Sequence, residues 1–130
     1  MNKTFYTSIE QSKKLLELGL NHESADMTYP WYIEDDGDKF EDGHQITTPV
    51  IGKSTWRGYI PCWSLAALLD VLPIYIGDYS KCLYYDNGSW CCGYMYDGDF
   101  MLTIEETKAD NPVDACYKMI IKLKEKGFEL

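Results

Sequence analysis

The dipeptide Asn87-Gly88 most constrains the fold, because both residues tolerate positive φ and together favour a two-residue β-hairpin turn. The segments on either side are rich in residues that favour strands, so they are predicted to pair as antiparallel neighbours. A second turn signal, Asp97-Gly98, precedes a third predicted strand. We therefore expect a β-meander at about 81–104, with strands at 81–86, 89–96 and 100–104.

The clearest helix start is Asn111-Pro112-Val113-Asp114. Asparagine is a favoured N-cap residue, proline suits the first helical turn, and an acidic side chain is stabilised at the positive end of a helix. Gly127 is placed to end this helix in a left-handed conformation. One face is predicted to belong to the core because apolar residues recur on it at helical spacing: Val113, Cys116, Tyr117, Ile120 and Leu123.

The same helix carries a stripe of lysines, Lys118, Lys122 and Lys126. Cations near a helix C-terminus interact favourably with the helix dipole, and long charged side chains are ordinarily solvated. We therefore interpret the stripe as a solvated face and not as a contact with nucleic acid.

Two further helices are predicted in the first half of the chain. One spans about 8–18 and begins in a capping box at Thr7-Ser8-Ile9-Glu10, with Ser8 and Gln11 as an overlapping alternative. The other spans 63–72 and is apolar on nearly all sides, so it is expected to be buried. Short strands are expected at 29–33, 46–51 and 74–76.

The length and composition fit a single folded unit. At 130 residues, of which 45% are apolar, the chain falls in the size range of one domain and has enough apolar material to fold alone. The order of predicted elements indicates an α+β fold, with three helices packed on a small antiparallel sheet and the helix at 63–72 between the sheet and the terminal helices. We therefore expect a single α+β domain spanning 1–130.

The charge balance limits the possible partners. The chain has 12 Lys+Arg against 21 Asp+Glu, a formal net charge of -9, which disfavours general binding to nucleic acid and to anionic membrane surfaces. No apolar stretch approaches the ~20 residues of a membrane-spanning helix, and no signal-peptide run follows the first residues. We expect a cytoplasmic chain that does not bind membranes, with its five cysteines reduced and no disulfide.

The segment 21–48 is where a binding surface is first expected, because so long a connection in a compact domain is usually functional or mobile. It combines aromatic residues with an acidic cluster. Most aromatic residues of the chain are expected in the core, but exposed ones in loops serve as interface anchors or as stacking surfaces for planar ligands. The candidate residues for binding a protein partner or a planar ligand are Trp31, Tyr32, Asp35, Asp36, Asp38, Trp56 and Arg57.

No residue pattern predicts a metal, a cofactor or a catalytic site. The acidic loop lacks the ligand spacing of an EF-hand, and the adjacent Cys91 and Cys92 would point to opposite faces of a strand, far in sequence from His22 and His44. Cys62 precedes a predicted helix and could have a lowered pKa, yet cysteines are more often small buried apolar residues. We expect no metal and no cofactor, and catalysis is the least favoured class of function.

Three blocks of the sequence carry a resemblance: the segment from Thr7 to Leu20, Ile60-Pro61-Cys62-Trp63-Ser64-Leu65-Ala66-Ala67-Leu68-Leu69, and Asn111-Pro112-Val113-Asp114-Ala115-Cys116. They resemble an uncharacterised family of small proteins from gut-type bacteria and their phages or mobile elements. The resemblance implies a dispensable accessory protein, and it carries no activity, cofactor or catalytic residue.

Two functions from different classes follow. The first is an accessory or modulator protein that acts by protein–protein interaction, because the chain is strongly acidic and its acidic loop contains large aromatic residues. The alternative is a small-ligand binding protein that stacks a nucleobase or nucleotide between loop aromatics such as Trp31, Tyr32 and Trp56. Because phosphate would require a local cation, a pocket that brings Arg57 beside an aromatic ring would favour the alternative.

Overall fold

A computed structural model of the chain describes residues 5–32, 44–45, 48–52, 59–96 and 99–130. In these ranges the α-helices are α1 (Ile9–Glu17), α2 (Leu65–Val71) and α3 (Pro112–Glu125), with a short 3-10 helix η1 (His22–Ser24). The strands are β1 (Met27–Tyr29), β2 (Trp31–Tyr32), β3 (His44–Gln45), β4 (Val50–Ile51), β5 (Ile60–Cys62), β6 (Tyr75–Ile76), β7 (Tyr79–Asp86), β8 (Ser89–Tyr96) and β9 (Asp99–Ala109).

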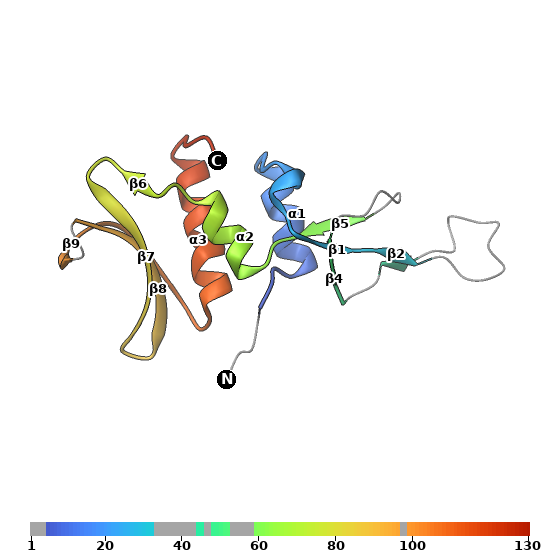
Figure 1. Ribbon diagram of the computed structural model, residues 1–130, viewed down its shortest axis with the longest axis horizontal. Helices are drawn as coiled ribbons and strands as arrows, with labels where there is room; N and C mark the ends of the chain where they lie inside the picture. The colour runs from blue at the N-terminus through green and yellow to red at the C-terminus, as the bar shows by residue number, and fades with distance from the viewer. Residues whose placement is uncertain (1–4, 33–43, 46–47, 53–58, 97–98) are drawn as a thin grey trace.

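The described strands form antiparallel sheets at opposite ends of the molecule. The larger sheet has the order β6-β7-β8-β9, a second has the order β4-β1-β5, and β2 pairs with β3. Helices α2 and α3 lie between the two larger sheets, and α1 lies on the far side of α3 from the four-stranded sheet (Figure 1). The predicted α+β class is confirmed. We expected all three helices to pack on one face of one sheet. Instead, α3 packs against β8 and β9 of the four-stranded sheet, whereas α1 packs against β5 of the three-stranded sheet.

The predicted meander forms the larger part of the four-stranded sheet. Strand β7 pairs with β8 along its whole length, from Tyr79↔Tyr96 to Asp86↔Ser89. The turn between them has φ of 52° at Asn87 and 84° at Gly88, which is the conformation that this dipeptide favours. The second turn signal, Asp97-Gly98, lies outside the described residues.

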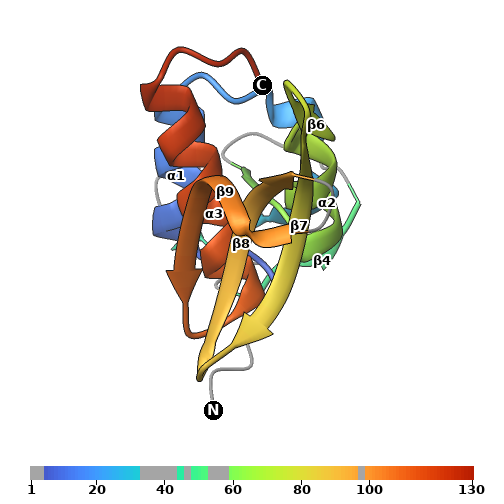
Figure 2. The same cartoon turned by 90° about the vertical axis from the view of Figure 1, so that its left-hand side faces the viewer.

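The core lies where α2 and α3 pack on the inner face of this sheet (Figure 2). Asn111 caps α3 as predicted, since its side-chain oxygen accepts a hydrogen bond of 2.8 Å from the backbone of Asp114. Of the predicted core face, only Tyr117 is partly exposed. The largest fully buried apolar side chains come from α1, α2, α3 and β8 and from the residues that flank α2: Trp63, Tyr94, Leu15, Leu68, Leu72, Met119, Ile120 and Leu123.

Strand β9 continues to Ala109, beyond the strand end expected at residue 104. The segment Glu105-Glu106-Thr107-Lys108 is polar, but its side chains alternate between two faces. Glu105 and Thr107 face α3, where Thr107 donates a hydrogen bond of 2.7 Å to the carbonyl of Ala115. Glu106 faces away from the helices and accepts a hydrogen bond of 2.5 Å from the hydroxyl of Tyr84. The strand extends because both sets of polar groups find partners.

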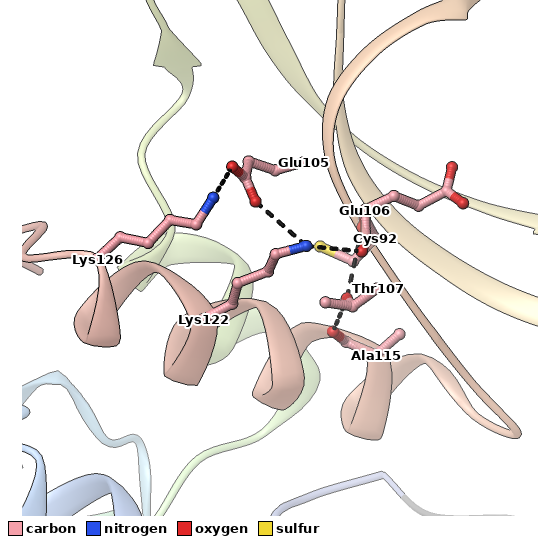
Figure 3. Close-up of polar contacts among 7 residues, drawn as sticks. All are labelled: Cys92, Glu105, Glu106, Thr107, Ala115, Lys122 and Lys126. Atoms are coloured by element: carbon pink, nitrogen blue, oxygen red, sulfur yellow. Dashed lines mark hydrogen bonds and ion pairs between the residues drawn. The ribbon is translucent and has the colours of Figure 1, made fainter.

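The lysine stripe of α3 is largely exposed to solvent, as interpreted from the sequence, but it also holds this part of β9. Glu105 forms an ion pair of 3.2 Å with Lys122 and a shorter one with Lys126 (Figure 3). Lys122 also donates to the carbonyl of Glu106 at 3.3 Å, and Lys118 donates to the carbonyl of Lys108 at 2.9 Å. The sequence does not show that β9 lies alongside α3. The helix dipole and solvation therefore explained the position of these lysines without any contact with a strand.

The N-cap of the first helix is one residue later than the first capping box in the sequence predicted. Ser8 is the N-cap of α1, and its hydroxyl and the side chain of Gln11 form the reciprocal capping box. The alternative was therefore right, and the box starting at Thr7 was wrong. Thr7 is fully buried, and its hydroxyl bonds to Ser12 and to the backbone of Trp63 instead.

The short strands differ in detail from those predicted. The expected strand at 29–33 is divided between β1, which starts at Met27, and β2; Ile33 lies outside the described residues. The expected strand at 46–51 is represented by β4, whereas residues 46–47 are not described. Strand β6 agrees with the expected strand at 74–76.

The ion pairs of Glu105 predict a pH-dependent stability. The hydrogen bond from Lys126 lowers the pKa of the Glu105 carboxyl below its ordinary value of 4.5, burial opposes this shift, and Lys122 adds to it. A lowered folded-state pKa stabilises the protein above the unfolded pKa, and this contribution is lost as the pH falls through the folded pKa. Glu105→Gln should therefore cost about 1 kcal/mol at pH 7, and progressively less below pH 4.5.

Urea unfolding of wild type and variant at both ends of this pH range measures the difference. Glu125→Gln, at an exposed position at the end of α3, is the matched control and should leave stability nearly unchanged. An equal cost of Glu105→Gln at neutral and acid pH would contradict the role of the carboxylate.

Candidate functional site

The candidate site is an arm made of β1, β2, β3 and β4. It extends from α1 away from the four-stranded sheet (Figure 1). The candidate residues Trp31 and Tyr32 form β2, opposite Gln45 and His44 of β3. The structure thus places the backbone of both predicted aromatic residues at the far end of the arm.

The base of the arm is fixed by polar side chains between β1 and its neighbours. Both carboxylate oxygens of Asp26 accept hydrogen bonds from Ser64, one from its backbone at 3.0 Å and one from its hydroxyl at 2.5 Å. The carbonyl of Asp26 accepts a hydrogen bond of 2.9 Å from the backbone of Gly52, and Thr28 donates one of 2.7 Å to the carbonyl of Gly52. Asp26 therefore connects the start of α2 with the end of β4.

A buried polar cluster around Thr7 connects the arm with the helices. The Thr7 hydroxyl lies 2.8 Å from the hydroxyl of Ser12 in α1 and accepts a hydrogen bond of 3.1 Å from the backbone of Trp63. The Thr7 carbonyl accepts a hydrogen bond of 2.7 Å from the hydroxyl of Tyr29 in β1 and a weaker one from the thiol of Cys62. Thr7 thus joins the segment before α1 to β1 and β5.

The environment of Cys62 does not suit a nucleophile. Burial raises the pKa of this thiol above its ordinary value of 9.0, and hydrogen bonds with Thr7 and Tyr29 oppose the shift only in part. Burial also raises the pKa of the Tyr29 hydroxyl, with Cys62 as the next cause. Because a reactive cysteine needs a lowered pKa and access to substrate, Cys62 is a structural residue of the cluster.

The apolar surface of the arm is on β4. Val50 is 51% exposed and Ile51 is 89% exposed, although β-branched apolar side chains are usually buried. Among the described strands, β4 pairs with β1 alone, so it is an edge strand of its sheet. Within the described residues the arm therefore offers both an uncovered apolar pair and an open strand edge.

The other candidate residues lie outside the described residues: Asp35, Asp36, Asp38, Trp56 and Arg57. Sequence reasoning missed Val50 and Ile51, which look like an ordinary buried strand. The flanking Pro49 and Gly52 were the signal that this strand is short and lies at an edge.

Two further observations concern the chemistry of the described residues. They contain no group of three or more His, Cys, Asp or Glu that could hold a metal ion. In the same part of the chain, none of the helices is both long and apolar enough to cross a membrane.

Comparison of the chain with protein-family models, with curated proteins and with solved structures found no match.

The Thr7 cluster predicts a specific loss of stability. Thr7→Val removes the hydroxyl and leaves the buried backbone N–H of Trp63 without its acceptor, which should lower the free energy of unfolding by about 1–3 kcal/mol. Thr7→Ser keeps the hydroxyl and should cost less than Thr7→Val. Urea unfolding of the three proteins tests this, and equal losses in both variants would show that the methyl group matters and the hydrogen bonds do not.

Proposed function

We propose that this chain is a cytoplasmic accessory or modulator protein, of phage or mobile-element origin, that acts by protein–protein interaction through its arm. The observation that carries the proposal is the exposure of Val50 and Ile51 on the edge strand of a firmly held arm. The resemblance of the three sequence blocks supports the accessory role and the origin.

The arm has the properties of an interface anchor. Apolar residues that are already ordered lose little conformational entropy on binding, and the contacts of Asp26 and Thr7 hold the base of the arm in place. Exposed apolar side chains provide area to bury, and an open strand edge provides unpaired backbone groups. Trp31, in the strand β2 that follows β1 along the arm, is the candidate aromatic anchor.

The net charge of -9 favours a basic partner surface. Opposite charge speeds the encounter of two proteins, whereas buried apolar and aromatic contacts slow their dissociation. The acidic residues Asp35, Asp36 and Asp38 and the apolar residues of the arm are therefore proposed to affect different rate constants.

The proposal predicts that two exposed isoleucines differ in function. Ile51→Ser, on the arm, should lose the host proteins that wild type captures from a lysate. Ile74→Ser is the matched control, because Ile74 is 67% exposed but lies beside β6, in the other sheet, and this variant should capture the same proteins as wild type. Identical capture by wild type and Ile51→Ser, with both proteins folded, would remove the arm from the interface.

Once a partner has been identified, the rate constants test the two kinds of contact. Trp31→Ala should speed dissociation by a factor that corresponds to about 2 kcal/mol or more, the usual threshold for a hot spot. Replacing Asp35, Asp36 and Asp38 with Asn should instead slow association and flatten its dependence on salt. Surface plasmon resonance over a range of salt concentrations measures both effects.

A further inference from the structure

Strand β7 leaves most of one edge of the four-stranded sheet open. It pairs with β8 along all of Tyr79–Asp86, but β6 pairs only with Tyr79 and Ser80. Figure 2 shows β7 at the margin of the sheet, with β6 beside its upper end only. In the described part of the chain, no strand covers β7 beyond Lys81.

The hairpin geometry shows which backbone groups point outward from this edge. In a two-residue hairpin the residues flanking the turn, here Asp86 and Ser89, hydrogen-bond to each other, and inward and outward positions then alternate. Leu83 and Tyr85 consequently direct their N–H and C=O groups away from β8. The outward hydrogen bond of 2.9 Å from the backbone of Lys81 to Ile74 agrees with this alternation.

The centre of the open part of β7 lacks the usual protection of an edge strand. Edge strands are commonly blunted by proline, by bulges or by charged side chains. The stretch Cys82-Leu83-Tyr84-Tyr85 contains neither proline nor charge. The charge of the preceding Lys81 does not lie along the open edge, because its ammonium group donates hydrogen bonds to the carbonyls of Leu69 and Leu72 at the end of α2.

We propose that two copies of this chain associate through β7, antiparallel about a two-fold axis at Tyr84. In this register Leu83 lies opposite Tyr85 of the partner subunit, and their outward N–H and C=O groups form four intermolecular hydrogen bonds, two at each end. The two sheets then become one continuous sheet, in which β7 lies beside β7 of the partner subunit.

The symmetry of the edge and the absence of charge at its centre favour a second copy as the occupant. Each chain carries a net charge of -9, which opposes self-association at long range, but the proposed register brings no like charges into contact. The only charged residue in the paired window, Asp86, meets Cys82 of the partner subunit. The outward groups are also symmetric about Tyr84, so the edge is complementary to itself. Pairing would cover Tyr85, which is 62% exposed beside the ring of Trp90.

The oligomeric state over a range of concentrations is the first test. Sedimentation velocity of wild type should show a monomer–dimer equilibrium that shifts toward dimer when salt screens the repulsion between the two acidic chains. Tyr85→Pro removes an outward N–H without removing a bond to β8, and should raise the dissociation constant at least tenfold. Tyr85→Thr also loses the ring but keeps the N–H, and should remain dimeric.

A covalent test checks the register. Residues on the two-fold axis lie ~4.5 Å apart between Cα atoms, which is within disulfide range. Tyr84→Cys should give a covalent dimer with oxidised glutathione, which accepts the two electrons and two protons released as the S–S bond forms. The background is Cys82→Ser with Cys91→Ala, because Cys91 lies opposite Tyr84 on β8 and would otherwise compete for the new thiol. Lys118→Cys, at an exposed position of α3 in the same background, should stay monomeric on a denaturing gel.

The proposal is overturned if wild type is monomeric throughout the series, or if Tyr85→Pro dimerises as wild type does. A different result would be a monomeric wild type that captures a foreign protein, with the capture lost in Tyr85→Pro. This would show that the edge pairs with a strand of another protein and not with a second copy. Because β7 and the arm lie at opposite ends of the molecule, failure of either proposal leaves the other standing (Figure 1).

Discussion

The hydrogen bonds of the buried Thr7 residue join the two ends of the molecule, because they connect the arm with the helices that lie between it and the four-stranded sheet. A hydroxyl or carbonyl removed from water destabilises a protein unless it is hydrogen-bonded, and both groups of Thr7 have partners. These partners come from α1, from β1 and from the residue after β5. The side chain and backbone of Thr7, together with the contacts of Asp26, thus hold the base of the arm against the helices.

The elements that were predicted well are those specified by neighbouring residues. The Asn87-Gly88 turn requires positive φ at both positions, and few other dipeptides adopt it readily, so the hairpin follows from two residues. The start of α3 follows likewise from Asn111, because the cap, the proline and the acidic residue all act within one turn. Tertiary contacts agree with these local preferences and were not needed to find them.

The elements that were missed depend on residues distant in sequence. Thr7 looked like an N-cap because the sequence does not show that Trp63 needs its hydroxyl. Strand β9 was expected to end at residue 104, because the lysines that pair with its polar end, Lys122 and Lys126, lie on another element. The residues of the candidate site differ in the same respect. Trp31 and Tyr32 were chosen because their segment combines aromatic and acidic residues, whereas the exposure of Ile51 depends on which strands surround it.

The hydrogen bond between Gln11 and Asp114 has a consequence for biosynthesis. The side chain of Gln11, which also caps α1, donates to the carboxylate of Asp114 in the first turn of α3 at 2.8 Å, across a separation of 103 residues. The strands of the meander and α3 are consecutive in the chain, so they can meet soon after they leave the ribosome. The segment containing α1 emerges first, yet its contacts with the helices are completed only after α3 has been translated.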